Sequence, residues 1–517
     1  MNRVVAGGLA LASVVAGKAA IACRLRRPAE GWRRTVGILL RSEPTRFAVS
    51  AFGLHVPGAA PGDPPDRIHV LAADALRQYL ARTSDAHFAL EWRRTVTVRR
   101  RIASVEIALL EFAGNGDLRS VTPLLGGAAG DAEDRARAED AIVAAYNATR
   151  RMPEVERPGA LRRAVDGRLR SDAASAEYAR RLLSATCVSF EPLDRSHSVA
   201  RFVPPQFHLR RSLGFGFLTI VMRTTTPASD VDVWVSAHHV GLDGVPLQEL
   251  VSGLEREWGS DAAMTFPAAD RDRPFIGPRA CSVDGERAVE EALAFVEFAP
   301  VMALRRAVNA RFAERLHAPA TFGAVLAWML AAEPEFAGVR IASTVDVAAS
   351  NGYERDVDVV PLRPGDYATA RDRWQDFVDF ANEFNRLLAL SRVRRSPLRA
   401  GMSTAGLLPA AVHAHVVRAN PAALDDTFGS VCITIIRDAK VFVAPMTDLG
   451  LRHGFFAIGS TNLPAADGSR VAAVSIKGDA GSIAGHHAAL RRAIARSATM
   501  AASLNSSDSP RPESERQ

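Results

Sequence analysis

Cysteine is scarce in this chain of 517 residues. Its four cysteines lie at positions 23, 187, 281 and 432, and no two of them form the Cys-x-x-Cys pair of thiolate metal sites and redox motifs. So few cysteines in so long a chain also argue against a fold held by disulfides. The sequence therefore predicts neither a disulfide framework nor a metal centre.

Lysine is rarer still and occurs only at positions 18, 440 and 477, so almost all of the 64 basic residues are arginines. The net charge is +7 at pH 7. The arginines are scattered along the chain and are not grouped with aromatic residues as on a nucleic-acid-binding surface. We expect no nucleic-acid partner, whereas a modest positive field suits an anionic small molecule.

Long apolar runs are also missing, with one candidate near the N-terminus. Residues 4–23 are rich in glycine and alanine but include Lys18, and arginines follow them. The part before Lys18, residues 4–17, is shorter than a comfortable span of about 20 apolar residues. Two interpretations stay open, a signal-like or anchoring segment and a surface leader. We expect a cytoplasmic protein, with membrane association through residues 4–23 as the alternative.

The stretch best suited to chemistry is His-His-Val-Gly-Leu-Asp-Gly at residues 238–244. It follows an alternating run in which Val231, Val233 and Val235 share one face, as in a half-buried strand. The histidines thus lie where a strand ends and a turn begins, a common position for catalytic side chains. Imidazole is the side chain best matched to proton transfer near neutral pH. The alternative interpretation is a pair of buried, hydrogen-bonded histidines with a structural role.

Two segments show apolar residues at helical spacing. The first follows the motif directly and predicts a helix with one buried face, made of Leu247, Leu250, Val251, Leu254 and Trp258. The second lies in the long segment 365–425 and predicts a buried stripe made of Trp374, Phe377, Phe380, Phe384 and Leu388.

Five segments of the first half have counterparts in the same order in the second half, which indicates an internal repeat. The pairs are 141–155 with 322–336, 186–189 with 431–434, 213–217 with 452–456, 226–230 with 463–467, and the strand before His238 with 471–476. Each copy has the order helix, strands, motif strand, helix. This order predicts an α/β fold of two tandem lobes, each a mixed sheet covered by helices.

The second copy lacks the functional side chains of the motif. His486 and His487 come after its turn, at helix positions, so we do not expect them to replace the lost histidines. One copy of the duplicated domain is therefore expected to be without chemistry. The aligned pairs are His239 with Ala480, Asp243 with Ala484, and Gly244 with Gly485.

The motif and the order of elements resemble those of the CoA-dependent acyltransferase superfamily. This superfamily includes chloramphenicol acetyltransferase, the catalytic domain of the dihydrolipoyl (2-oxoacid dehydrogenase) acyltransferases, condensation domains of peptide synthetases and wax-ester acyltransferases. The resemblance implies two chloramphenicol-acetyltransferase-like sandwich lobes. The expected parts are a leader and extension (1–84), a first lobe with the motif (85–262), a degenerate second lobe (263–500) and a disordered tail (501–517).

The resemblance also implies a mechanism. The second histidine of the motif, His239, is the general base in this superfamily. It would take a proton from the thiol of coenzyme A, or from the hydroxyl or amine of a small acceptor. The freed nucleophile would then attack the acyl carbonyl directly in a ternary complex. The resemblance gives Asp243 a structural role in the loop, while Gly244 allows the tight backbone there and His238 orients the turn.

An oxyanion donor is needed as well. Dihydrolipoyl enzymes take it from a serine in a strand of the neighbouring subunit, and the matching position in the second copy here is Ile436, which has no hydroxyl. Thr434 is the nearest candidate. The chain has no lipoyl-attachment sequence, so acyl-CoA and a small acceptor are the expected substrates, and the sequence gives no oligomeric state.

Two further functions stay open. One is a condensation- or wax-ester-type transferase that uses a longer acyl chain, which the long segment 365–425 favours. The other is a catalytically inactive binding or scaffold protein with the same fold, which the missing serine and the altered second motif favour.

Overall fold

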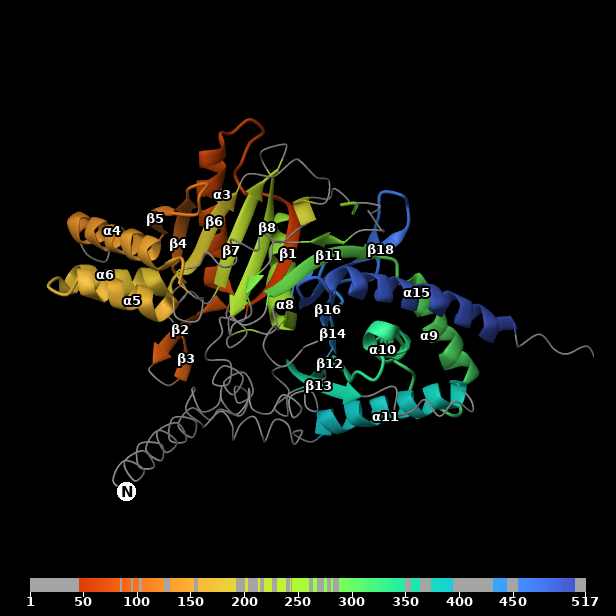
Figure 1. Ribbon diagram of the computed structural model, residues 1–517. Helices are drawn as coiled ribbons and strands as arrows, with labels where there is room; N and C mark the ends of the chain where they lie inside the picture. Colours follow the sequence, from red (N-terminus) through yellow and green to blue (C-terminus); the bar gives the residue numbers. More distant parts are fainter. Residues whose placement is uncertain are drawn as a thin grey trace, which may run out of the picture. The chain divides into compact units, whose positions relative to one another are not determined.

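The computed structural model describes residues 46–83, 86–93, 96–101, 105–124, 131–152, 157–191, 200–202, 213, 218–225, 230–238, 242, 244–259, 264–266, 274–276, 280–281, 288–348, 355–362, 373–393, 431–443 and 454–506. These residues divide into two compact units. The first holds the described residues up to 264 together with Phe442–Val443, and the second holds the others. Each unit is built around one large sheet (Figure 1).

The first unit contains a seven-stranded mixed sheet in the order β15-β1-β8-β7-β6-β4-β5, and β2 and β3 pair separately. The strands are β1 (Arg46–His55), β2 (Phe88–Arg93), β3 (Val96–Arg101), β4 (Ile107–Phe112), β5 (Leu118–Leu124), β6 (Thr186–Glu191), β7 (Leu218–Thr224), β8 (Asp230–His238) and β15 (Phe442–Val443). The helices are α3 (Pro65–Arg82), α4 (Ala132–Thr149), α5 (Arg157–Arg168), α6 (Ala173–Ser184), the 3₁₀ helix η3 (Ala200–Phe202) and α8 (Gly244–Trp258).

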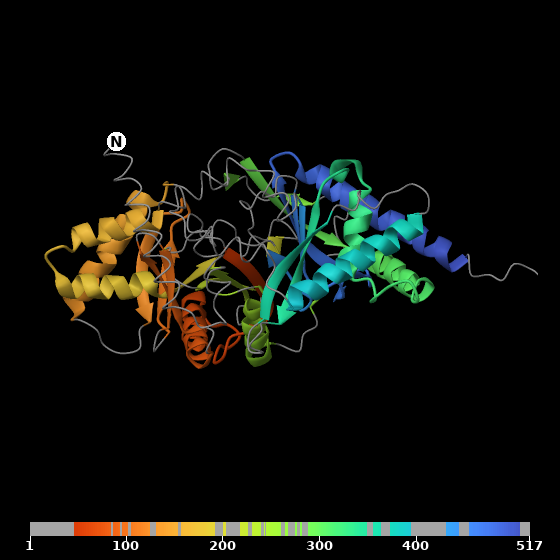
Figure 2. The same ribbon diagram turned by 90° about the horizontal axis from the view of Figure 1, so that it is seen from below.

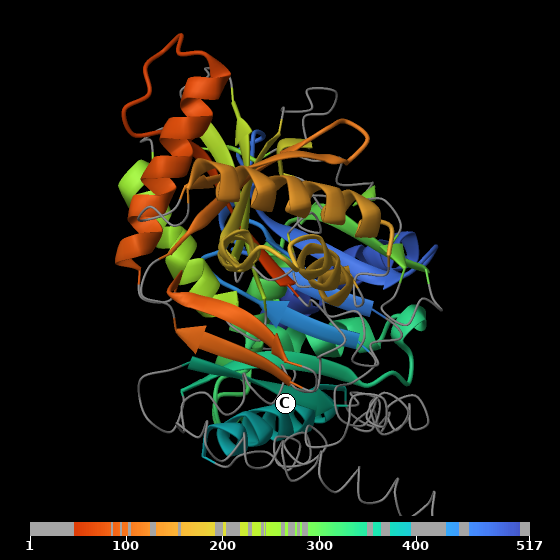
Figure 3. The ribbon, with the colours of Figure 1, turned by 90° about the vertical axis from the view of Figure 1, so that its left-hand side faces the viewer.

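Helices lie on both faces of this sheet. On one face α3 packs beside α8 (Figure 2), where the Tyr79 hydroxyl donates to the carbonyl of Leu250 at 2.6 Å. Gly253 permits this approach, because a Cβ at 253 would lie 2.3 Å from the Tyr79 oxygen. The other face is covered at the β4–β5 end by α4, α5 and α6, which lie side by side (Figure 3).

The second unit has a sheet in the order β10-β11-β18-β16-β14-β12-β13, with β17 beside β18 and β9 beside β11. Its strands are β9 (Phe275–Ile276), β10 (Ala280–Cys281), β11 (Ala288–Val296), β12 (Ile341–Ala348), β13 (Arg355–Leu362), β14 (Val431–Ile435), β16 (Gly454–Ile458), β17 (Leu463–Pro464) and β18 (Arg470–Asp479). Its helices are α9 (Ala299–Arg311), α10 (Phe322–Ala331), the 3₁₀ helix η4 (Pro334–Phe336), α11 (Arg373–Val393) and α15 (Ile483–Ser506).

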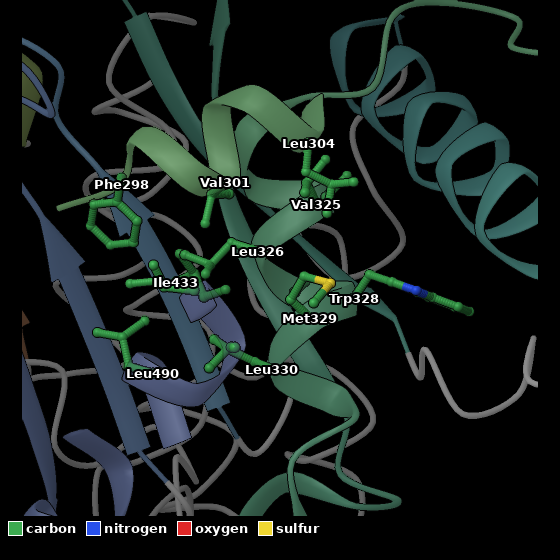
Figure 4. Close-up of a cluster of buried hydrophobic side chains, with 14 of the residues drawn as sticks. Phe298, Val301, Leu304, Val325, Leu326, Trp328, Met329, Leu330, Ile433 and Leu490 are labelled. Atoms are coloured by element: carbon green, nitrogen blue, oxygen red, sulfur yellow. The ribbon is translucent and has the colours of Figure 1, made fainter. Parts of the chain in front are cut away.

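The core of the second unit forms around α10, which is apolar on all sides and is therefore enclosed by its neighbours. Leu326 and Leu330 of α10 point toward Ile433 of the sheet and Leu490 of α15 (Figure 4). Trp328 lies on another side of α10 and packs against α11. Its ring centroid is 5.8 Å from that of Phe377 and 5.3 Å from that of Phe380. Of the stripe predicted in 365–425, Phe377, Phe380 and Phe384 are confirmed as core, whereas Trp374 and Leu388 are only half-buried.

The two sheets share their topology. Read from β15 and from β10, the six successive pairings have the same directions: three antiparallel, two parallel and one antiparallel. Each copy also ends in a helix after its motif strand, α8 or α15. The predicted α/β fold of two lobes, each a mixed sheet with helices, is confirmed.

The hydrogen-bond register aligns the copies residue by residue. In each sheet, residues paired from strand to strand form a row that crosses the sheet, and we call these the first row and the second row. Alanine, cysteine and proline stand on the same three strands in both rows, and this recurrence fixes the alignment. The first row is Ala48, Ser236, Thr219, Cys187, Ala108 and Pro123. The second row is Glu291, Lys477, Phe455, Cys432, Ala342 and Pro361.

Two pairs of the predicted repeat are wrong. The rows align Thr219 with Phe455, so the counterpart of Phe455 lies outside 213–217. The segments 141–155 and 322–336 are both alanine-rich, but α4 follows β5 whereas α10 precedes β12. By its place in the order, the counterpart of α4 is α11. Composition alone matched two helices that the topology separates. The boundaries expected for the lobes stay predictions, although β1 and α3, from within residues 1–84, belong to the first unit.

A buried ion pair ties η3 to the first sheet. Arg201 donates from Nε and Nη2 to the two carboxylate oxygens of Asp232, each at 2.7 Å, and the backbone N–H of Gly53 donates to Asp232 at 2.8 Å. Asp232 is fully buried on β8. Gly53 lies at an irregularity of β1 with φ of +63°, a conformation that favours glycine. These contacts hold β1, β8 and η3 together.

Replacing Arg201 with methionine is expected to lower the free energy of unfolding by about 3 kcal/mol, because Asp232 would stay buried without its cation. Urea unfolding at pH 7 measures the change. Arg82→Ala, which removes an ion pair to Glu257 between exposed side chains, serves as the control and is expected to cost less than about 1 kcal/mol. Equal losses in the two variants would contradict the structural role of the Arg201–Asp232 pair.

Candidate functional site at the end of strand β8

The structure places the motif at a junction between strand and helix. β8 ends at His238, whose Cα pairs with that of Arg46 in β1, and α8 begins at Gly244. Leu242 between them is fully buried. His239 and Asp243 lie outside the described residues, so their roles stay predictions. The predicted strand and helix around the motif are both present.

Helix α8 forms as the spacing predicted, with its whole apolar stripe turned into the core. These side chains are at most 4% exposed: Leu247, Leu250, Val251, Leu254 and Trp258. Strand β8 differs from the prediction in one respect. The alternation indicated a half-buried strand, but Asp232, Trp234 and Ser236 are as fully buried as the valines. The reason is that β8 is a central strand, between β1 and β7, with both faces covered.

The face of the sheet that holds Trp234 and Ser236 contains polar side chains that the sequence analysis missed. Ser236 of β8 and Thr219 of β7 stand directly opposite one another. They are 0% and 2% exposed, and neither hydroxyl oxygen has a hydrogen-bond partner among the described residues. Both look like ordinary strand residues in the sequence, and only pairing and burial together distinguish them.

Trp234 adds a third such group two residues before Ser236 on the same strand. Its ring is fully buried and makes an edge contact with Phe52, with centroids 5.7 Å apart. The indole Nε1 has no hydrogen-bond partner within the described part of the chain. Since alternate residues of a strand share a face, Trp234 and Ser236 face the same way.

The second row has long charged side chains where the first has short ones. Lys477 stands at the position of Ser236, and Glu291 stands at that of Ala48. Their charged groups form an ion pair at 3.2 Å, and the Ser475 hydroxyl donates to Glu291 at 2.9 Å. Both charged side chains are nearly buried, at 10% and 13% exposure. Counting on from Lys477 reproduces the predicted alignment of the motif with residues 480–485.

The turn of the second copy is fixed by its own contacts. Glu290 accepts a hydrogen bond from the backbone N–H of Gly481 at 2.9 Å. His486 and His487 of α15 are buried. The ring of His486 packs against Phe336, with centroids 5.3 Å apart, and a Cβ at Gly478 would approach it to 2.8 Å. These histidines are core residues of the second unit.

Thr434, the oxyanion candidate, lies in β14 of the second unit opposite Ala457 of β16, and it is 8% exposed. Its neighbour Ile433 faces the helix-covered core, so Thr434 faces the other side of the sheet. Ile436 is 7% exposed. The structure thus places His238 and Gly244 at one junction and Thr434 in the other unit.

Within the described residues, no three or more histidine, cysteine, aspartate or glutamate side chains gather so as to hold a metal ion. Nor does any helix there combine the length and apolar character that a bilayer span requires. Residues 4–23 lie outside the described part.

Comparison with known proteins gives similarity to solved structures only. No family model matches the sequence, and no curated protein matches it. A trichothecene 15-O-acetyltransferase from Fusarium sporotrichioides has a TM-score of 0.45 and 9% identity over 91% of this chain and 93% of its own. A wax ester synthase/diacylglycerol acyltransferase from Marinobacter aquaeolei has a TM-score of 0.41 and 12% identity, over 89% of this chain and 96% of its own.

A variant of the starter condensation domain of rhizomide synthetase, solved in complex with C8-CoA, has a TM-score of 0.39 and 11% identity over 91% of this chain and 93% of its own. The structural neighbours are therefore acyltransferases and condensation domains, including one that holds an acyl-CoA.

Cys432 is unsuited to act as a nucleophile, because complete burial raises the pKa of its thiol to about 12. At pH 8 the thiolate fraction would be on the order of one in ten thousand. Iodoacetamide at pH 8 is therefore expected to leave Cys432 unmodified in the folded protein, as peptide mass spectrometry would report. The urea-unfolded protein is the control and should be modified fully. Equal modification in both states would contradict this burial.

Proposed function

We propose that this chain is an acyltransferase that moves an acyl group between coenzyme A and a small acceptor, with His239 as the general base. The observation that carries the proposal is the position of the histidine pair. The pair falls where the central strand β8 ends and α8 begins. The two copies have the same topology, and this copy is the one whose motif keeps the histidines, the aspartate and the glycine.

The mechanism follows from the chemistry of imidazole. His239 removes the proton from the attacking group as that group meets the acyl carbonyl. The attacking group is the thiol of coenzyme A in one direction and the acceptor hydroxyl or amine in the other. A positioned base of this kind contributes about 10²–10⁴-fold to the rate. Direct transfer needs no acyl-enzyme, which agrees with the inert thiol of Cys432.

The remaining roles complete the site. His238 orients the turn, Asp243 fixes the loop, and Gly244 starts α8. Thr434 is the proposed donor to the oxyanion, where a preorganised hydrogen bond contributes most to catalysis. Thr434 lies in β14 of the second unit.

The proposal is tested by thioester turnover. The purified protein is incubated with acetyl-CoA or octanoyl-CoA and a panel of small alcohols and amines, and released coenzyme A is measured with a thiol reagent. His239→Ala is expected to reduce kcat/KM by about 10²–10⁴-fold because the base is lost. His317→Ala, at an exposed histidine of the second unit, is the matched control and should act as the unchanged protein does.

The outcomes separate the three candidate functions. Turnover with acetyl-CoA supports the small-acceptor acyltransferase, and a strong preference for octanoyl-CoA supports the longer-chain transferase. Binding of coenzyme A without any turnover supports the inactive binding protein. Equal rates for His239→Ala and the unchanged protein would remove His239 from the mechanism.

A further inference from the structure

We infer that the first sheet carries a polar binding subsite, formed by Thr219, Trp234 and Ser236, for an oxygen-bearing group of a small substrate. The inference rests on the proposed function and names the chemistry of the substrate that the same site takes. The oxygen is that of a hydroxyl, carbonyl or ether group, carried by the acceptor or by the acyl donor.

Three polar atoms of this face make no hydrogen bond within the part of the chain that the structure describes. The hydroxyl oxygens of Thr219 and Ser236 and the indole Nε1 of Trp234 have no partner among the described residues, and the three side chains are at most 2% exposed. A buried polar atom without a partner lowers stability, and native proteins keep few of them. Three on two adjacent strands form a cluster that a ligand satisfies.

The geometry suits one small polar molecule. Residues directly opposite in an antiparallel pair bring their Cβ atoms to about 5 Å, so the hydroxyls of Thr219 and Ser236 lie on the same face, within reach of one small ligand group. Trp234 lies about 7 Å further along the strand. An indole N–H only donates, whereas hydroxyls both donate and accept. The ligand atom facing Trp234 is therefore an acceptor, and oxygen is the common one.

The second copy has different side chains at the same place in its sheet. There Glu291 and Lys477 replace Ala48 and Ser236, and Ser475 replaces Trp234. The long charged side chains fill the row and satisfy one another, and Ser475 donates to Glu291. At the same register the first copy has the short side chains of Ala48 and Ser236 and the larger ring of Trp234, and its polar atoms have no partner among the described residues. The copy that keeps the motif is thus the one without a charged pair in its row.

The position of the subsite fits a role beside the motif. Ser236 is two residues before His238 on β8, a separation of about 7 Å along the strand. A small substrate spans this distance. The cluster is polar, so an alkyl chain bound there would leave all three polar atoms unsatisfied. The subsite therefore favours a small oxygenated substrate over a long acyl chain. Because the side chains are buried, entry requires local opening of this face.

Three apolar near-isosteres test the subsite: Thr219→Val, Ser236→Ala and Trp234→Phe. Each removes one unsatisfied polar atom, so thermal stability is expected to stay equal or rise in the first two. The KM of the substrate that carries the oxygen is expected to rise about 3- to 10-fold with little change in kcat, as for the loss of one hydrogen bond made equally in ground and transition states. Varying acetyl-CoA and the acceptor separately shows which substrate it is.

A pair of acceptors that differ by one hydroxyl sharpens the test. The unchanged protein should prefer the hydroxylated member, because a site built to bind a hydroxyl rejects the analogue that lacks it, and the variants should lose that preference. Ser475→Ala is the control in the second copy. It removes a hydroxyl that is already paired, so stability should fall while both KM values stay the same.

Unchanged KM values and an unchanged preference in all three variants, with the starting protein active, would overturn the subsite and leave the proposed function standing. Loss of stability in Thr219→Val and Ser236→Ala would also overturn it, because the hydroxyls would then be structural. Absence of turnover and of coenzyme A binding in the starting protein would overturn the proposed function, and the subsite with it.

Discussion

Hydrogen bonds between β8 and its neighbours β1 and β7 decide which side chains of the first unit meet. A slip of one residue would turn every side chain of β8 to the other face of the sheet. The slip would bury the valines where Asp232, Trp234 and Ser236 now lie, and it would break the pair between Asp232 and Arg201. The fully buried carboxylate of Asp232 accepts two hydrogen bonds from Arg201 and one from Gly53, so this ion pair helps to specify the register. The strand end, and with it the position of the histidine pair, depends on this register.

The duplication separates what the fold requires from what function requires. Ala108, Cys187 and Pro123 recur at the register positions of Ala342, Cys432 and Pro361, at the end of the sheet away from the motif. An edge strand accommodates proline because its free side needs no donor. The other end of the row has changed completely, from short side chains to Lys477 and Glu291. The two copies differ most at the end of the row near the motif. There the second copy has a charged pair, and the first copy has short side chains.

Much of this organisation could be predicted from periodicity. The spacing of Leu247, Leu250 and Leu254 gave α8, and the aromatic stripe of Phe377, Phe380 and Phe384 gave α11, since helical faces repeat every three to four residues. The pairing of α4 with α10 failed, because alanine-rich helices look alike and only topology tells them apart. The burial of Trp234 and Ser236 was not predictable either. The alternation in β8 put Trp234 and Ser236 on the face opposite the valines, which was expected to be exposed. Only the sheet order shows that both faces are covered. The hydroxyl of Thr219 is significant through its neighbour across the sheet, a non-local relation that a local pattern does not contain.

The short strand β15 belongs to the first sheet but comes from the second half of the chain. Phe442 and Val443 complete the edge of the first sheet beside β1, while the residues before them belong to the second unit. No single cut of the chain releases both sheets whole, because division between the copies would strip the first of its outermost strand. An uncovered edge invites pairing with other chains. The first sheet is therefore complete only when both halves belong to one continuous chain.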